Sequence, residues 1–271
     1  MSTRFAVAEP RPYDQPYRAT RAAFTWLLER EVVRFLKIWQ FTVAGPILSA
    51  LLFVLVFGFA LSGHISGVEG VPYDQFILPG LAAQAVVTVG YINGTTSLFD
   101  ARRDRYIHDV LASPVRWWEL NLALVAGGAI RGLLVGSGIL LIAMPATHLQ
   151  VHQPLVLAVA ALAILLAAGQ LGVLAGSYAR TLDHVYSIET LVVLPLGFLG
   201  GIFYSVGELP EPWRAISHLN PVFYVVQALR IGLLGRGDIS TTAALVAVGG
   251  LAAVLTLWSA LVFRSGRLLK P

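Results

Sequence analysis

Six long apolar runs constrain the fold of this chain more than any other feature. A helix needs about 20 consecutive apolar residues to cross the hydrocarbon core of a bilayer. Because a helix pairs its own backbone groups in lipid, such runs predict an all-α membrane protein with six transmembrane helices. Only 13% of the 271 residues are charged, about half of the roughly 25% typical of soluble domains. The runs, almost free of charge, lie at 42–61, 76–99, 120–146, 155–178, 187–204 and 243–263.

The distribution of basic residues predicts the orientation of these helices. Fifteen of the 19 Lys and Arg residues fall on one side of the predicted topology, before the first run, after the second, after the fourth and after the sixth. Segments that face the cytoplasm retain more positive charge than exported ones. We therefore expect both termini in the cytoplasm. The same bias accounts for the net charge of +4, so we expect no nucleic-acid partner.

The segment 20–40, which follows a proline-rich tail at 1–19, has the pattern of an amphipathic helix. Arg30, Arg34 and Lys37 form a basic stripe that is separate from the apolar positions. The pattern predicts an interface helix on the inner leaflet, either as an anchor to anionic lipid or as a docking surface for a cytosolic partner. The apolar positions are Phe24, Leu28, Val32, Phe35 and Trp39.

A second short helix is predicted between the second and third runs. Ile107, Val110 and Leu111 share one helical face, and Pro114 ends the helix. The two tryptophans at 117 and 118 suit a membrane interface. A basic cytoplasmic loop with aromatic anchors accounts for the Arg and Trp residues, but the compact apolar face favours a helix that contacts another surface.

Two ionisable residues interrupt the apolar runs, Arg131 in the third and Glu189 in the fifth. A charge in hydrocarbon costs at least about 2.5 kcal/mol, so each needs a partner, water or a cavity. We expect both to face the interior of the bundle or a transport pathway. Two alternatives stay open, in which Arg131 meets the C-terminal carbonyls of a helix and Glu189 reaches the cytoplasmic surface. His148 and His152 are four residues apart, but no third ligand type accompanies them, so we predict no metal site.

Catalytic motifs are missing from the sequence. It contains no HExxH and no GxSxG motif. A phosphate-binding loop needs a lysine after glycine, whereas the two lysines, Lys37 and Lys270, each follow leucine. We therefore expect a transport subunit rather than an enzyme, with no cofactor in this chain. Any ATP and Mg²⁺ would be bound by a partner.

The segment 195–230, PLGFLGGIFYSVGELPEPWRAISHLNPVFYVVQALR, resembles the signature region of ABC-2 type exporter permeases. It shares with them a Pro-led apolar run, a Gly-aromatic turn, LP, a tryptophan helix, NP and the ending ALR. The loop RRDRYIHDVLASPVRWWEL is similar to the first coupling helix of that family. Unlike many members, this chain has no glycine between Asp104 and His108.

The resemblance covers 20–271 as one transmembrane domain and implies a bacterial inner-membrane exporter. It implies a second, identical permease chain, two cytoplasmic ATPase subunits, and short external re-entrant helices between the fifth and sixth spans. The residues implied to contact the ATPase are Phe24, Leu28, Arg34, Tyr106, Ile107, Val110, Leu111, Pro114, Asp183 and His184. The residues implied to form an external cap are Pro210, Trp213, Asn220, Pro221 and Tyr224.

Two other functions remain open at this stage. An ion-coupled secondary transporter would need titratable groups along its pathway, and the apolar runs offer almost none. A membrane scaffold without transport activity conflicts only with the signature region. The substrate implied by the family is a lipid, a glycan or a hydrophobic drug-like molecule, and no residue selects among these classes.

Overall fold

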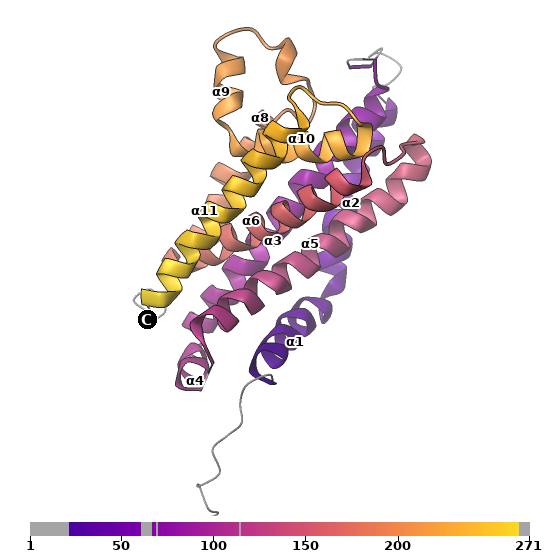
Figure 1. Cartoon of the computed structure of the whole chain (residues 1–271). Helices are drawn as coiled ribbons and strands as arrows, with labels where there is room; N and C mark the ends of the chain where they lie inside the picture. Colours follow the sequence, from indigo (N-terminus) through magenta and orange to yellow (C-terminus); the bar gives the residue numbers. More distant parts are fainter. Residues whose placement is uncertain (1–21, 61–66, 69, 114, 266–271) are drawn as a thin grey trace, which may run out of the picture.

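The computed structural model describes residues 22–60, 67–68, 70–113 and 115–265, and its regular secondary structure in these ranges is helical. Six helical segments are long and apolar enough to cross a membrane. The structure thus confirms the prediction of an all-α protein with six candidate spans. Figure 1 shows a bundle of long helices with α1 and α4 at one end and α9 at the other. The tail at 1–19 and Pro114 lie outside the described residues.

The first three spans belong to the first half of the chain. The interface segment is α1 (Ala22–Leu36). The first candidate span, Gln40–Gly58, includes η1 (Gln40–Ala44), α2 (Gly45–Phe53) and part of η2 (Val54–Ala60). Then follow α3 (Tyr73–Arg103), α4 (Ile107–Ala112) and α5 (Trp117–Thr147), of which α3 and α5 are the second and third spans.

The second half contains the other three spans. The fourth is α6 (Pro154–Tyr178), and the fifth, Leu182–Leu199, joins α7 (Leu182–Ile188), η3 (Glu189–Val193) and α8 (Leu194–Leu199). A loop region then contains η4 (Val206–Glu208), α9 (Trp213–Leu219) and α10 (Pro221–Leu234). The sixth span is α11 (Thr241–Ser265).

The fifth span begins and ends earlier than its apolar run, 187–204. Its start is capped by Thr181, whose hydroxyl accepts a hydrogen bond from the His184 backbone N–H at 3.3 Å. It ends before Gly201, which has a φ of 80° in the left-handed region that glycine adopts without strain. Helix-ending backbone geometry, rather than the loss of apolar character, therefore sets the end of this span.

Helix α3 is the centre of the bundle. It packs against α5, α6 and α10, and 78% of its membrane-competent window is buried. Its contact with α6 depends on glycine. A side chain at Gly172 would overlap the backbone of Tyr91, and one at Gly176 would approach the Thr95 carbonyl oxygen to 2.8 Å. Small residues let helix backbones approach closely in membranes, so these two glycines set the separation of α3 and α6.

We predict that Gly172→Val destabilises the protein by roughly 1–3 kcal/mol or more, because overpacking forces α3 and α6 apart. Gly250→Val is the matched control, since a side chain at that position of α11 meets no atom within 4 Å. Thermal unfolding of both variants in detergent, followed by size-exclusion chromatography, measures the difference. Equal melting temperatures for the two variants would contradict the assigned α3–α6 contact.

Candidate functional site

The short helix α4 lies at one end of the bundle and packs inward. Ile107 is 1% exposed and Val110 is 8% exposed, and both join a cluster with Leu27 of α1, Leu98 of α3 and Leu120 of α5. The apolar face that the sequence assigned to ATPase contact therefore meets the chain's own helices. The amphipathic pattern identified one apolar face, but the surface that covers this face belongs to the same chain. The side chain of Leu111 lies outside the described residues.

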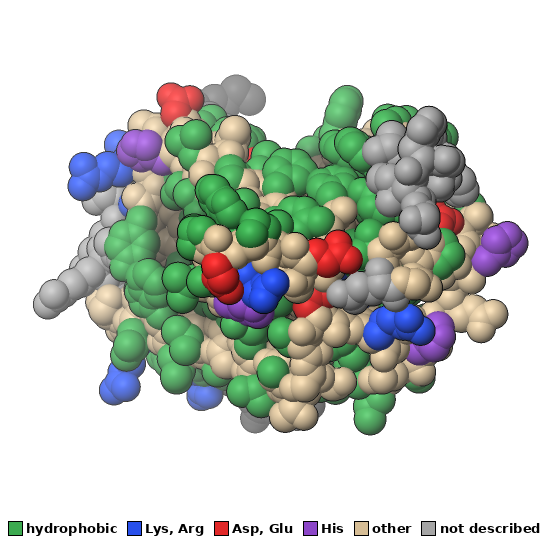
Figure 2. All heavy atoms as spheres, turned by 90° about the horizontal axis from the view of Figure 1, so that it is seen from above, with side chains coloured by type: hydrophobic (Ala, Val, Ile, Leu, Met, Phe, Trp, Pro, Cys, Tyr) green, Lys and Arg blue, Asp and Glu red, His purple; other side chains and the backbone are tan. Residues whose placement is uncertain are grey.

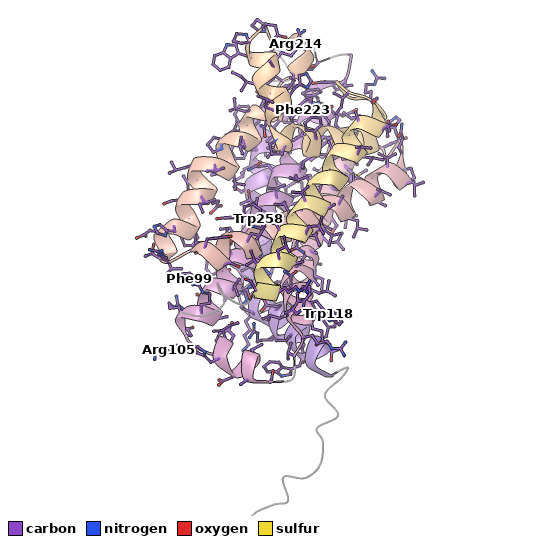
Figure 3. The ribbon with its side chains drawn as sticks, turned by 60° about the vertical axis from the view of Figure 1, so that its left-hand side comes forward. Phe99, Arg105, Trp118, Arg214, Phe223 and Trp258 are labelled. Atoms are coloured by element: carbon purple, nitrogen blue, oxygen red, sulfur yellow. The ribbon has the colours of Figure 1, made fainter. Side chains whose placement is uncertain are left out.

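The outward face of α4 and its preceding turn is polar. Arg105, His108 and Asp109 are exposed there, and Figure 3 shows Arg105 at this end of the molecule, far from Arg214. Asp104 accepts a hydrogen bond from Arg103 at 2.8 Å, and this contact lowers the pKa of the Asp104 carboxyl. This end thus offers charged, solvated groups to a partner protein.

The start of α7 belongs to the same end of the bundle. Arg102, near the end of α3, donates hydrogen bonds to the carbonyl oxygens of Gly176, Ser177 and Ala179 at 2.8–3.2 Å. A guanidinium at these terminal carbonyls satisfies groups that a helix end leaves unpaired. The clamp fixes the chain that leads into α7, where Asp183 and His184 are exposed.

The basic stripe of α1 mainly contacts other residues of this chain, whereas the sequence predicted a surface for anionic lipid or for a cytosolic partner. Arg30 and Arg34 both bind Glu31, at 2.7 Å and 3.2 Å, and the Glu31 side chain is only 1% exposed. Ser97 of α3 donates to the same carboxylate at 2.6 Å. Of the three basic residues, Lys37 is exposed, and Arg30 and Arg34 are half-buried. The outward surface of α1 instead carries apolar side chains, among them Trp26 and Leu36.

Glu31 therefore joins α1 to the bundle, and neighbouring residues on α3 and α5 extend this contact. Arg34 also donates to the carbonyl and side-chain oxygens of Asn93 at 3.1 Å and 3.2 Å, and to the Thr96 hydroxyl at 3.3 Å. On α5, Gly127 leaves room for Glu31, because a side chain there would come within 2.6 Å of its Cβ. We call Arg30, Glu31, Arg34, Asn93 and Ser97 the α1 joint.

Tyr106 connects the α1 joint to α4. The Arg30 guanidinium lies over the Tyr106 ring at 4.7 Å from its centroid, within the range of a cation–π contact. Burial raises the pKa of the Tyr106 phenol and the nearby Arg30 lowers it, with burial the larger effect, so the phenol stays neutral at physiological pH. Phe24 and Leu28 of α1 are half-buried. A displacement of α4 would therefore also shift the residues of α1 and α3 that form the α1 joint.

We predict that Glu31→Gln destabilises the protein by about 2–3 kcal/mol, because two partly buried arginines lose their shared counter-charge. Glu29→Gln is the matched control, since Glu29 is exposed and lies two residues earlier on the same helix. The unfolding midpoint of each variant in detergent tests this. A Glu31 variant as stable as the Glu29 variant would show that the α1 joint contributes little.

An open groove of about 370 Å³ lies between the first, second and fifth spans. Aromatic rings of Phe41, Phe53 and Phe198 line it, and its polar side chains, Ser49, Gln84 and Thr88, are uncharged. None of the described residues that line it is charged. The groove therefore suits an apolar body that carries neutral hydrogen-bonding groups.

Gln84 of α3 fixes the fifth span beside this groove. Its amide nitrogen donates to the Val193 carbonyl oxygen at 3.4 Å and to the Thr88 hydroxyl at 3.3 Å. Gly197 of α8 lies against the same amide, where any side chain would overlap it. The half-buried face of α3 continues with Thr96 and Asp100. Polar side chains at this spacing give the otherwise buried α3 one hydrophilic side.

Arg131 and Glu189, the two charges predicted inside the spans, occupy different surroundings. Arg131 is 8% exposed, and its Nε donates to the Thr42 carbonyl oxygen at 3.0 Å. Glu189 is half-buried at the start of η3, near Tyr91 of α3, whose hydroxyl donates to the Val185 carbonyl oxygen at 3.0 Å. The two residues do not pair with each other, and their roles in transport stay predictions.

The opposite end of the bundle contains the motif Asn220-Pro221. The Asn220 side chain accepts from the Val222 backbone N–H at 2.9 Å and donates to the Leu196 carbonyl oxygen at 2.6 Å, so it caps α10 and ties it to α8. Pro221 occupies the first position of α10, where its missing N–H costs nothing. Helix α10 is almost wholly buried, whereas Trp213 of α9 is 56% exposed.

Tyr224 and Pro210 make further hydrogen bonds at this end of the bundle. The Tyr224 hydroxyl donates to the His218 carbonyl oxygen at 2.9 Å, and Pro210 accepts backbone hydrogen bonds from Trp213 and Arg214. Seen from this end, the surface is covered largely by hydrophobic and uncharged side chains, with charged groups scattered among them (Figure 2). Whether α9 and α10 re-enter a membrane from outside stays a prediction.

The sequence analysis missed three side chains that anchor distant segments to one another, Glu31, Arg230 and Asp238, of which the first two are buried. Because Glu31 lies among other charged residues in the sequence, its burial could not be recognised. Arg230 is 1% exposed, donates to the Gly201 carbonyl oxygen at 2.7 Å and lies 3.8 Å over the Phe76 ring. Asp238 accepts from Ser205 and from the Val206 backbone N–H at 3.1 Å and 2.8 Å. The available sequence signals were the ALR ending, which contains Arg230, and the acidic residue after a glycine, Asp238. Neither signal identifies the distant residue that the side chain contacts.

Six apolar spans, a helical end with exposed charges and an uncharged groove between spans define a multi-pass membrane protein of the transporter class. A family model described as ABC-2 type transporter matches residues 22–234, and the chain belongs to this family. It is 35% identical over 232 residues to the inner membrane transport permease YadH of Escherichia coli (strain K12), covering 85% of this chain and 91% of that protein.

More distant relatives come from rhizobia. The chain is 28% identical over 184 residues to nodulation protein J of Sinorhizobium fredii (strain NBRC 101917 / NGR234), covering 66% of this chain and 69% of that protein. It is 23% identical over 208 residues to nodulation protein J of Rhizobium meliloti (strain 1021), covering 76% and 79%.

Proposed function

We propose that this chain is the membrane-spanning permease subunit of an ATP-driven exporter in a bacterial inner membrane. The observation that carries the proposal is the 35% identity to an inner membrane transport permease over 85% of the chain. The absence of a phosphate-binding loop from the sequence supports a separate ATPase, which would bind ATP and Mg²⁺. In this proposal two ATPase subunits bind the end that carries α1 and α4, and this end is cytoplasmic, as its basic residues indicate.

A second, identical permease chain completes the proposed pathway. The first and fifth spans are the least buried of the six, at 22% and 17%, and residues of both line the groove. Their exposure supports a partner chain on this face, with the pathway between the two copies. The uncharged, aromatic lining favours a lipid, a glycan or a hydrophobic drug-like substrate, and α9 and α10 would form its external cap.

Coupling would run from α4 to the groove. ATP binding would move the ATPases against the exposed residues of α4 and the start of α7, while Ile107 and Val110 hold α4 to the bundle. Tyr106 and the α1 joint would carry this movement to α1 and α3. A ligand shifts such an equilibrium only by contacts that differ between the two states, so the outer surface of α4 is the proposed point of control.

We predict that Asp109→Arg weakens assembly with the proposed partner ATPase by roughly tenfold in affinity, because a reversed charge at the contact costs more than about 1 kcal/mol. Glu211→Arg, the same reversal at the opposite, exposed end, is the control. Co-purification of the tagged permease with the ATPase measures the loss. Equal recovery of the ATPase with both variants would contradict the assigned docking surface.

We predict that Ala85→Trp abolishes the stimulation of ATP hydrolysis by substrate, because the added indole fills the groove that Ala85 lines. Ala253→Trp places the same ring on the exposed side of α11 and is the control. The purified complex is assayed with a panel of lipids, glycans and drugs. Stimulation retained in the Ala85 variant would place the substrate elsewhere, and transport driven by an ion gradient without ATP would overturn the ATP-driven function.

A further inference from the structure

Arg131 lies near the start of the first span, although its place in the sequence suggests the middle of the bilayer. Helix α5 has 31 residues, and at 1.5 Å per residue it is about 46 Å long, against roughly 30 Å of hydrocarbon. Arg131 meets Thr42, the third residue of the first span. The guanidinium therefore lies near the edge of the hydrocarbon layer, on the side of α1.

The charges around this point do not balance. Arg30 and Arg34 share the single carboxylate of Glu31. Arg131 forms no ion pair with any residue that the structure describes, and Arg34 lies near enough for the two positive charges to repel each other. Lys37, one turn after Arg34, adds an exposed positive charge. Asp100 of α3 also attracts Arg34, but no carboxylate among the described residues pairs with Arg131, so the surroundings of Arg131 favour an anionic ligand.

The surroundings of Arg131 fit a molecule with an acyl chain as well as a charge. Ile38, whose carbonyl oxygen accepts from the Thr42 hydroxyl, is 52% exposed, and Leu134, one turn above Arg131 on α5, is 42% exposed. A guanidinium binds phosphate oxygens in pairs, which an ammonium does not. Basic residues at a membrane edge attract anionic headgroups, and apolar neighbours attract the chains.

From these contacts we infer that Arg131, together with the exposed Lys37 that precedes the first span, binds the phosphate of an anionic phospholipid where α1 and the first span meet α5. The lipid phosphate supplies the negative charge that the fold lacks at Arg131. The lipid holds α1 against α5, next to the α1 joint. This site is separate from the groove and requires neither the ATPase nor a transported substrate, so its failure would leave the proposed export function standing.

The test is the melting temperature of the purified full-length chain in detergent, with phosphatidylglycerol, phosphatidylcholine or inorganic phosphate added. A ligand that binds the folded state raises this temperature. We expect phosphatidylglycerol to raise it most, and Arg131→Gln to remove most of that rise. Arg264→Gln, at an exposed position in the last turn of α11, is the control and keeps the rise.

Two further variants keep the test decisive if Arg131→Gln does not fold. Lys37→Gln changes an exposed side chain and is expected to reduce the rise without affecting folding. Arg131→Lys keeps the charge, loses paired phosphate binding, and is expected to retain part of it. An equal rise with phosphatidylcholine, an equal rise with inorganic phosphate, or an undiminished rise in all the Arg131 and Lys37 variants that fold would each overturn the lipid site.

Discussion

The close approach of α3 to α6 is the contact on which the rest of the structure depends. Two glycines of α6 leave no room for a side chain against the backbone of α3, and this spacing places α3 in the middle of the bundle. In lipid, helices gain little from burying apolar surface against each other, so van der Waals packing at short range must hold them. The neighbouring α5 and α10 then contact a helix whose position is already set.

Because α3 is central, the polar side chains on its different faces have a structural consequence. Gln84 joins α3 to the fifth span beside the groove, and Asn93 and Ser97, nearer the other end, join it to α1. The groove and the α1 joint therefore share one rigid element. A single packed helix therefore connects the end that carries α4 to the groove, as the proposed coupling requires.

Amphipathic periodicity showed which residues share a helical face, but it did not show what that face contacts. For α4 the pattern placed Ile107 and Val110 on one apolar face, implied to contact the ATPase, and the structure buries both against the chain itself. For α1 the pattern separated Arg30 and Arg34 from the apolar positions, yet both arginines turn to Glu31. The helix N-cap at Asn220, by contrast, is a local interaction between neighbouring residues, of the kind that a sequence motif can show.

The sequence by itself determined the number of candidate spans, the all-α class and the membership of a transporter family. Each depends on the apolar character of about 20 consecutive residues or on a local motif, and these are properties of neighbours in the chain. Only the tertiary structure determined which partner each charged side chain contacts. Glu31 meets Ser97, Arg230 meets Gly201, and Arg131 meets Thr42. These partners are far apart in sequence, and only the packing of the spans brings them within hydrogen-bonding distance.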